Sequence, residues 1–209
     1  MPTASYDPSS PLFIVLNASS GRDDAAEVRS TVERVLAQAG RKHQVVQLAR
    51  GDDIEHAMQT AAAQALAANG ALVVAGGDGT VNAAAQAAHA AGCAMGVLPQ
   101  GTFNYFSRTH GIPSDTEAAA RLLLIASPQP VQVGLVNDRL FLVNASLGLY
   151  PQALEDREGY KRQFGRRRRV AMLSALATLT REHRQLPLSI GPHRPARTAR
   201  WKPPSPRSS

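Results

Sequence analysis

Three short segments rich in glycine and small polar residues hold the side chains that could do chemistry. They are Asn17 to Gly21, Gly76 to Thr80, and Pro99 to Asn104. Glycines let backbone N–H groups approach phosphate oxygens, and a helix that begins directly after such a loop points its positive end at the anion. The segment Gly76-Gly77-Asp78-Gly79-Thr80 follows the apolar run Ala71 to Ala75 and precedes a helical pattern. It therefore predicts a nucleotide-phosphate loop.

Asp78 gives that loop a further chemical possibility. A carboxylate among phosphate-facing amides is useful if it holds Mg²⁺ or accepts a proton from an attacking hydroxyl, and both are roles in phosphoryl transfer. The alternative is an ordinary strand-to-helix turn capped by Asp78, and a bare Gly-Gly-x-Gly is more often such a turn. The chain has no Gly-x4-Gly-Lys-Ser/Thr, and Gly77 to Asn82 lacks the third glycine of a dinucleotide fingerprint.

The elements that must position these residues alternate in type. Apolar runs predict strands near 12–16, 44–48, 71–75 and 94–98, and helical patterns lie near 23–39, 52–68, 81–91 and, after the capping box Ser114-Asp115-Thr116-Glu117, 114–127. This alternation predicts an α/β fold, a parallel sheet with helices on both faces. Ligands of such sheets bind at the carboxyl ends of the strands, so the three polar segments should share one edge.

The pattern changes near Ser127 to Pro130, where we expect a domain boundary. Two strands are predicted, at Val131 to Val136 and at Arg139 to Ala145. They are joined by Asn137-Asp138, because these residues tolerate the positive φ of a tight hairpin turn. A basic stretch, Lys161 to Arg169, and a helical segment near 170–184 follow. From Gly191 the composition shifts to Pro, Arg and Ser, which predicts a disordered tail.

Composition narrows the class of protein. The chain has 209 residues and a formal net charge of +7, and residues 128–209 hold 15 Lys and Arg against 5 Asp and Glu. The single cysteine, Cys93, excludes an intrachain disulfide and suits a reducing compartment. No apolar stretch reaches about 18 residues, and the first residues do not resemble a signal peptide. We therefore expect a cytoplasmic protein, with peripheral contact to a membrane as a further possibility.

The three polar segments, taken together, are similar to the catalytic domain of the diacylglycerol kinase and sphingosine kinase family, within the NAD kinase-like superfamily. The likeness runs from about Leu12 to at least Tyr150. Gly-Gly-Asp-Gly-Thr is shared with NAD kinases, whereas Leu98-Pro99-Gln100-Gly101-Thr102-Phe103-Asn104 is characteristic of the lipid kinases. The resemblance implies ATP and Mg²⁺ as cofactors, Asp78 as the catalytic residue, and the following nucleotide-binding residues: Asn17, Ser20, Gly21, Gly76, Gly77, Asp78, Gly79, Thr80, Val81, Asn82, Gly101, Thr102 and Asn104. It identifies no metal ligand.

The same resemblance implies a two-lobed organisation. We expect a flexible start at 1–10, an α/β ATP-binding catalytic lobe at 11–128, an incomplete β-rich second lobe with a helix at 129–190, and a disordered tail at 191–209. The family's second lobe returns with an Asp-Gly-x-Leu-type segment that carries carboxylates, and this chain lacks it. We therefore expect a truncated chain whose tail arose by a frameshift.

Two smaller departures concern single residues. Tyr105 stands where many members have aspartate, and Gln47 stands where the family often has a nucleotide-contacting threonine.

The stretch Lys161 to Arg169 carries six basic residues in nine positions. It is either a solvated helix start or a contact to an anionic membrane surface, and nucleic acid is a poorer partner because aromatic residues do not alternate with the charges. None of the six histidines shows ligand spacing.

Three functions follow from these observations. The leading hypothesis is an ATP-dependent lipid kinase that transfers the γ-phosphate to a lipid hydroxyl, such as that of diacylglycerol. The second is a non-catalytic nucleotide-binding fragment of such a kinase. The third, NAD phosphorylation, is disfavoured by the segment Leu98 to Asn104. The acceptor lipid and the oligomeric state cannot be predicted from the sequence.

Overall fold

The computed structural model describes residues 9–17, 25–49 and 51–145 of the chain. Its elements, in chain order, are β1 Leu12–Asn17, α1 Ala25–Gln38, β2 His43–Leu48, α2 Ile54–Ala67, β3 Ala71–Gly76, α3 Asp78–Ala91, β4 Ala94–Pro99, α4 Tyr105–Thr109, α5 Thr116–Ile125, β5 Gly134–Val136 and β6 Arg139–Phe141. The last residues of the family likeness, 146–150, lie outside the described residues. The predicted segments 161–169, 170–184 and 191–209 also lie outside them, as do Ser20, Gly21 and the helix start at Asp23 and Asp24.

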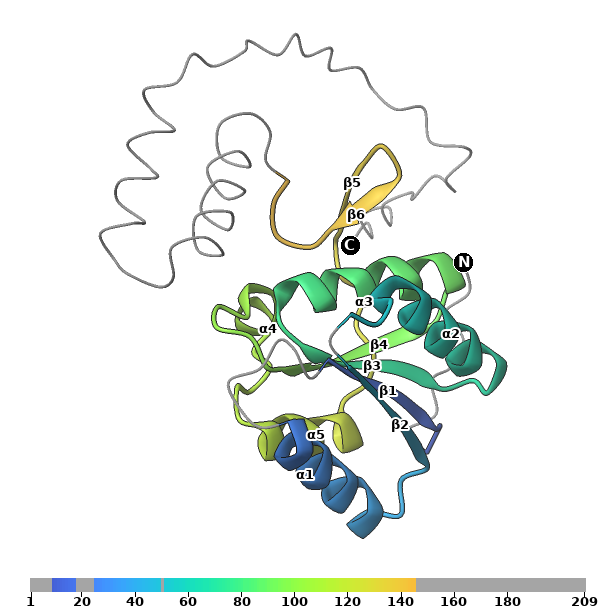
Figure 1. Cartoon of the computed structure of the whole chain (residues 1–209), viewed down its shortest axis with the longest axis vertical. Coiled ribbons are helices and arrows are strands. Elements are labelled where there is room, and N and C mark those ends of the chain that lie inside the picture. The colour runs from blue at the N-terminus through green and yellow to red at the C-terminus, as the bar shows by residue number, and fades with distance from the viewer. Residues whose placement is uncertain (1–8, 18–24, 50, 146–209) are drawn as a thin grey trace, which may run out of the picture. The chain divides into compact units, whose positions relative to one another are not determined.

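Four parallel strands form the central sheet, in the order β2-β1-β3-β4. The register pairs Leu12 with Ala71 and Gly76 with Pro99, so the strands run in one direction and end at one edge. Helices α2 and α3 cover one face of the sheet, and α1 and α5 cover the other (Figure 1). The predicted parallel α/β sheet with helices on both faces is therefore confirmed.

Alternation along the strands builds two cores. In β1 and β3, Val15, Leu72 and Val74 pack against α2 and α3, whereas Ile14 and Val73 pack against α1 and α5. All six residues of β3 are buried. A strand that is covered on both faces consists of consecutive apolar residues. This explains why β3 could be predicted from the sequence.

Three helices begin elsewhere than predicted. Helix α2 begins at Ile54, with Asp53 as its N-cap, and not at Asp52. Helix α3 begins at Asp78 and not at Val81, so Thr80 and Val81 are helical and do not belong to a loop. Helix α5 takes Asp115 as its N-cap, with the carboxylate accepting a hydrogen bond of 2.8 Å from the Ala118 amide, and Ser114 is not the capping residue. The short helix α4 was not predicted, because five residues are too few to show a helical period.

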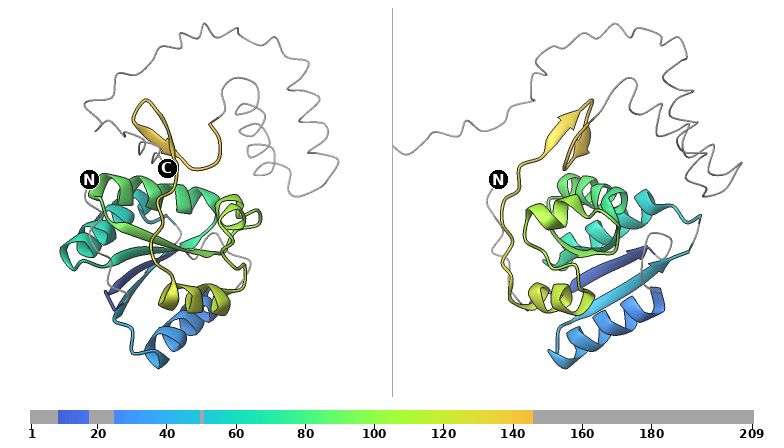
Figure 2. Two further views of the ribbon diagram at one scale, coloured as in Figure 1. Left: turned by 180° about the vertical axis from the view of Figure 1, so that it is seen from behind. Right: turned by 90° about the vertical axis from the view of Figure 1, so that its left-hand side faces the viewer.

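The predicted hairpin is present. Strands β5 and β6 pair antiparallel, with Val136 opposite Arg139. Asn137 and Asp138 both have positive φ, at 47° and 62°, as the two-residue turn requires. The strands are shorter than predicted, at three residues each. Residues up to Ala145 form one compact unit, which includes this hairpin, while the assignment of 129–190 to a second lobe stays a prediction. Figure 2 shows the hairpin in two further views.

Candidate functional site

The candidate site lies at the end of β3, where α3 begins. Gly77 is the N-cap of α3, with extended backbone, and makes no side-chain capping hydrogen bond. Helices α2 and α5 differ, because the carboxylates of Asp53 and Asp115 accept hydrogen bonds from their first-turn amides. The first amides of a helix have no partner within it and attract anions. Among these three helices, α3 is therefore the one whose first-turn amides receive no hydrogen bond from the side chain of the N-cap residue.

Two glycines bring the loop after β4 into direct contact with this start. A Cβ on Gly101 would lie 2.7 Å from the Gly77 Cα and 2.7 Å from the Asn104 Oδ1. The backbone also joins the two loops, because the Gln100 amide donates a 2.9 Å hydrogen bond to the Gly76 carbonyl. The two segments predicted to share an edge therefore touch, and at Gly101 only a residue without a side chain fits.

Gly76 is constrained from the other side by Thr80. A Cβ on Gly76 would lie 2.7 Å from the Thr80 Cβ. Thr80 in turn accepts a 3.0 Å hydrogen bond at its Oγ1 from the Asn17 Nδ2, and both side chains are only 6% exposed. Asn17, at the end of β1, thus joins β1 to the first turn of α3. The structure thus brings Asn17 and Thr80 together as a buried, hydrogen-bonded pair that lies against Gly76.

Asn104 shapes the β4–α4 loop. Its side chain makes two 2.9 Å hydrogen bonds to Gly101, accepting from the amide and donating to the carbonyl. Its backbone is left-handed, with φ 48°, a conformation that asparagine adopts more readily than most residues. The rings of its two sequence neighbours, Phe103 and Tyr105, stack on each other, with centroids 5.5 Å apart. Asn104 therefore closes the loop with its side chain.

The other predicted residues differ in exposure. Asp78 is half-buried and Gly79 is exposed, so both are accessible at the helix start, and Thr102 is exposed in the neighbouring loop. Val81 is buried in the core on the α2–α3 face. Asn82 is half-buried and donates from Nδ2 to the Leu140 carbonyl at 3.0 Å. Sequence reasoning missed this last contact, because no local pattern links residues 58 positions apart.

A cleft of about 400 Å³, lined by polar and apolar side chains, runs along α3 from Gly79 near its start to Ala90 near its end. Gly79, Asn82 and Gln86 of α3 form one wall, Glu55 and Gln59 of α2 a second, and the hairpin turn a third through Asp138 and Arg139. The cleft therefore connects the predicted phosphate loop with the hairpin that follows α5.

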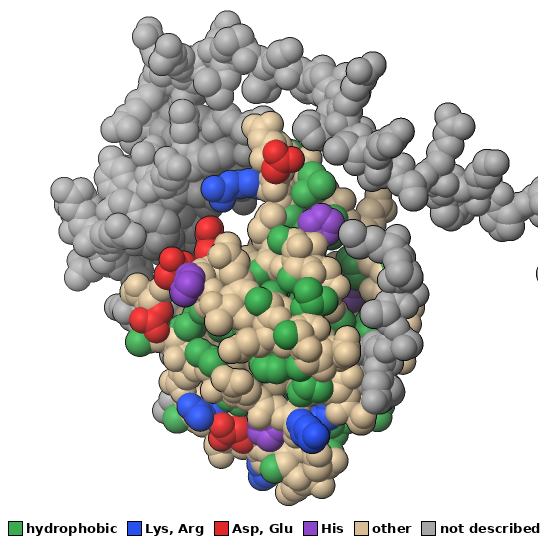
Figure 3. All heavy atoms as spheres, turned by 90° about the vertical axis from the view of Figure 1, so that its right-hand side faces the viewer, with side chains coloured by type: hydrophobic (Ala, Val, Ile, Leu, Met, Phe, Trp, Pro, Cys, Tyr) green, Lys and Arg blue, Asp and Glu red, His purple; other side chains and the backbone are tan. Residues whose placement is uncertain are grey.

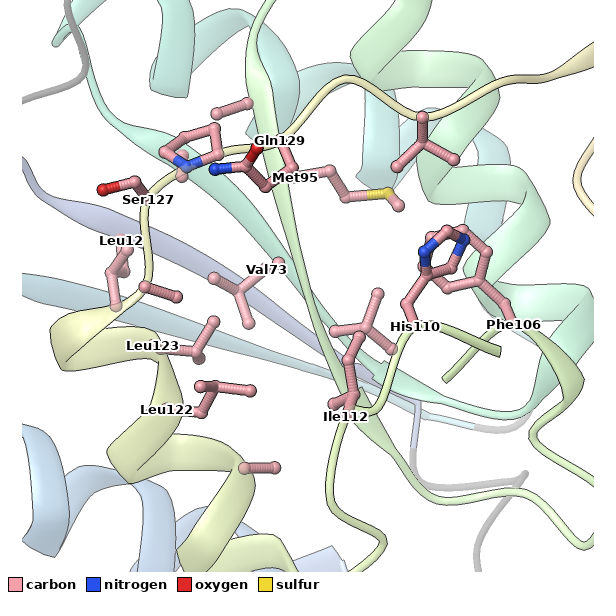
Figure 4. A pocket seen from close by; sticks show the side chains of 18 residues that line it. Leu12, Val73, Met95, Phe106, His110, Ile112, Leu122, Leu123, Ser127 and Gln129 are labelled. Carbon is pink, nitrogen blue, oxygen red and sulfur yellow. The ribbon is translucent and has the colours of Figure 1, made fainter. Parts of the chain in front are cut away.

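A second cavity, of about 360 Å³, lies along β4 and is apolar. Figure 4 shows Leu122 and Leu123 of α5 on one side of it and the rings of Phe106 and His110 at one end. These two rings lie 4.4 Å apart between centroids. No Asp, Glu, Lys or Arg side chain lines this cavity, so it offers no carboxylate or cation for phosphoryl transfer.

Three further observations limit the chemistry of the described part. No group of three or more His, Cys, Asp and Glu side chains that could hold a metal ion occurs in residues 9–17, 25–49 and 51–145. Burial raises the pKa of the Cys93 thiol, which disfavours the nucleophilic thiolate. On the face in Figure 3, the coloured Lys and Arg side chains are few and separated and do not form one basic patch.

The fold and the glycine-rich edge define an α/β domain of the kind that binds its ligands at the carboxyl ends of parallel strands. Residues 11–136 match the family described as the diacylglycerol kinase catalytic domain. This match covers more than half of the chain, and the chain belongs to that family.

Relatives and solved structures agree with the family. The chain is 31% identical over 143 residues to a Cronobacter sakazakii protein named "Probable lipid kinase YegS-like", an alignment that covers 65% of this chain and 45% of that protein. It is 41% identical over 97 residues to a protein of the same name from Pseudomonas putida, covering 45% and 32%. A diacylglycerol kinase structure from Bacillus anthracis superposes with a TM-score of 0.56 at 26% identity, covering 64% and 50%. The chain thus spans about half the length of these relatives or less.

Proposed function

We propose that this chain binds ATP at the edge formed by Gly76 to Asn82 and Gly101 to Asn104, as part of a lipid kinase that transfers the γ-phosphate to a lipid hydroxyl. One observation carries the proposal. The start of α3 has no capping side chain at Gly77, and the loop packed against Gly77 is a glycine loop that leaves no room for a Cβ at Gly101. Family membership supplies the reaction class, because the matched family is that of diacylglycerol kinases.

Each part of the site has a distinct role in this proposal. Backbone amides at the start of α3 would hold phosphate oxygens, because they point along the positive end of the helix dipole. Asn17 and Thr80 would support the loop from the interior of the domain, since their side chains are hydrogen-bonded to each other and buried. Ser20 and Gly21, also proposed to lie near the nucleotide, fall outside the described residues. Gly101 and Asn104 would hold the second loop against the first.

Asp78 is the proposed catalytic residue. It is the first residue of α3 and half-buried, so its carboxylate stands beside the amides that would face the phosphates. Mg²⁺, when bound with ATP, neutralises charge that develops on the transferred phosphoryl group. Asp78 fits that ion as an oxygen ligand, or it accepts the proton of the acceptor hydroxyl. The described residues supply no cluster of acidic side chains that would hold the ion without the nucleotide.

The acceptor is proposed to be a lipid such as diacylglycerol, met at the surface of a membrane. No helix among the described residues has the length and apolarity to span a bilayer. We propose that contact with an anionic bilayer is peripheral, and Lys161 to Arg169 is the segment proposed for it. That segment lies outside the described residues. The second candidate function is nucleotide binding without transfer.

Replacing Asp78 with asparagine tests the proposal. The purified chain is given labelled ATP, Mg²⁺ and diacylglycerol in mixed micelles, and both ATP binding and phosphatidic acid formation are measured. A general base or metal-linked carboxylate contributes on the order of 100-fold or more to turnover, so Asp78→Asn should lose at least that factor. The fold should survive, because loss of one charge at a helix start costs about 1 kcal/mol or less.

Asp53→Asn is the matched control. It makes the same chemical change at the start of α2, where asparagine caps a helix as well as aspartate does. Turnover in this variant should equal that of the wild type. Unchanged turnover in Asp78→Asn would remove Asp78 from the mechanism. ATP binding without phosphatidic acid would select the nucleotide-binding fragment, and the absence of both would end the kinase proposal for this chain.

A further inference from the structure

Two side chains on one face of α3 bind the main chain of a single residue, Leu140. The Asn82 Nδ2 donates to the Leu140 carbonyl at 3.0 Å, and the Leu140 amide donates to the Gln86 Oε1 at 2.7 Å. Asn82 and Gln86 are four positions apart, so they lie above one another on the helix surface. Both backbone polar groups of Leu140 are thereby satisfied by α3.

These bonds hold an element that could not keep its place alone. Strands β5 and β6 have three residues each, and a two-stranded hairpin is marginally stable by itself in water. Leu140 is only 3% exposed, so the residue that makes both hydrogen bonds to α3 is also the one that the hairpin buries. The hairpin is therefore attached to α3 at one well-defined point.

The attachment point is close to the proposed phosphate loop. Asn82 follows Asp78 by one helical turn, and Gly79, Asn82 and Gln86 line the same cleft as the hairpin residues Asp138 and Arg139. A rigid helix transmits the position of its first turn to the residues one and two turns later. Any change in the hairpin's position on α3 would therefore change the wall of the cleft that faces Gly79.

We propose that Asn82 and Gln86 are positioning residues, which clamp Leu140 so that the phosphate loop and the hairpin wall of the cleft keep one relative geometry. This inference rests on the proposed function, because it takes the start of α3 as the nucleotide site. It also assigns Asn82 a role through the hairpin, alongside the direct nucleotide contact that the family resemblance implies. Gln86 lies outside the family motif, and only its contact with Leu140 reveals it.

Hydrogen exchange at the Leu140 amide, resolved by NMR, tests the clamp. Gln86→Leu keeps the size and helix propensity of the side chain but removes the acceptor, so the Leu140 amide should exchange about fivefold faster or more. Gln86→Glu retains an acceptor oxygen and should restore slow exchange. Gln59→Leu is the matched control, because Gln59 lines the same cleft from α2. It should leave Leu140 exchange at the wild-type rate.

The positioning role is tested by adding Mg²⁺-ATP. If the loop and the hairpin are coupled through the clamp, saturating nucleotide should slow Leu140 exchange about fivefold or more in the wild type and in Gln86→Glu. Gln86→Leu should lose most of this response. Bound nucleotide also slows every amide that exchanges through global unfolding. The positioning role therefore requires that the slowing at Leu140 exceed the slowing at a core amide such as that of Leu72, which is fully buried.

The outcomes separate the two proposals. Equal Leu140 exchange in wild type and Gln86→Leu would overturn the clamp. ATP binding by the wild type with no change at Leu140 would overturn the positioning role and leave the proposed function intact, and this comparison needs no variant to fold. Absence of ATP binding would overturn the proposed function and the positioning role together. The hydrogen bond between the Leu140 amide and Gln86 would still be tested by the Leu140 exchange rate without nucleotide.

Discussion

The contact between the two glycine loops can be broken by adding one methyl group at Gly101. In Gly101→Ala the new Cβ would meet the Gly77 Cα and the Asn104 Oδ1, each at 2.7 Å. Neither atom can yield easily. The first is backbone at the start of α3, and the second accepts a 2.9 Å hydrogen bond from the Gly101 amide. The β4–α4 loop must therefore move away from α3.

The cost follows from these contacts. Overpacking a tight site costs about 1–3 kcal/mol. Loss of the two hydrogen bonds between Asn104 and Gly101 adds about 1 kcal/mol for each bond that is not re-formed. We expect Gly101→Ala to lower the free energy of unfolding by about 3 kcal/mol, which corresponds to a fall in Tm on the order of 10 °C for a unit of this size.

Gly79→Ala provides a contrast in the same site. A Cβ there meets nothing within 4 Å, and the position is helical. Alanine is favoured over glycine in helices by about 1 kcal/mol, so the Tm of this variant should stay constant or rise. Thermal unfolding followed by circular dichroism measures both variants, and titration with Mg²⁺-ATP shows whether Gly101→Ala also weakens nucleotide binding. A Tm within about 2 °C of wild type in Gly101→Ala would refute the argument that the loops are in tight contact.

Two further predictions concern titratable groups outside the loops. Because burial raises the pKa of Cys93, its thiol should react with a maleimide at pH 8 about tenfold more slowly than glutathione, and at a similar rate once urea unfolds the chain; fast labelling of the folded protein would contradict this. Hydrogen bonds from Arg34 and Arg121 lower the pKa of Glu117 from 4.5. A carboxyl group whose pKa is lower in the folded than in the unfolded protein stabilises the fold at any pH above its unfolded-state pKa. This contribution is lost as the pH falls through the folded-state pKa. Urea unfolding below pH 4.5 should therefore show a smaller acid-induced loss of stability in Glu117→Gln than in wild type, and equal losses would rule out this contribution.

Local signals explain which parts of the fold could be predicted. The run Ala71 to Ala75 predicted a buried strand because all of its residues are apolar, and β3 extends it by one residue only. Asn137 and Asp138 predicted a tight turn because few other residues tolerate positive φ at both positions. Helix ends were less predictable. The N-cap of α5 is decided by which side chain reaches the Ala118 amide, and Asp115 reaches it.

The site could be predicted in part. The sequence indicated that the three polar segments share an edge, because parallel strands end on the same side of a sheet, and the structure places Gly77 and Gly101 in contact. It did not indicate that Thr80 and Asn17 would be bonded to each other and buried. Nor did it single out Gln86, whose partner Leu140 lies 54 positions away.

The amino-acid sequence by itself determined the alternation of strands and helices, the glycine loops and the turn of the hairpin, since each depends on residues close together in the chain. Only the tertiary structure decided the strand order β2-β1-β3-β4 and the contacts that follow from it. Asn17 meets Thr80 because β1 lies beside β3, and α3 receives the hairpin because residues 126–133 lead the chain back to it. Such contacts join residues dozens of positions apart, and their free energy depends on packing that no local pattern encodes.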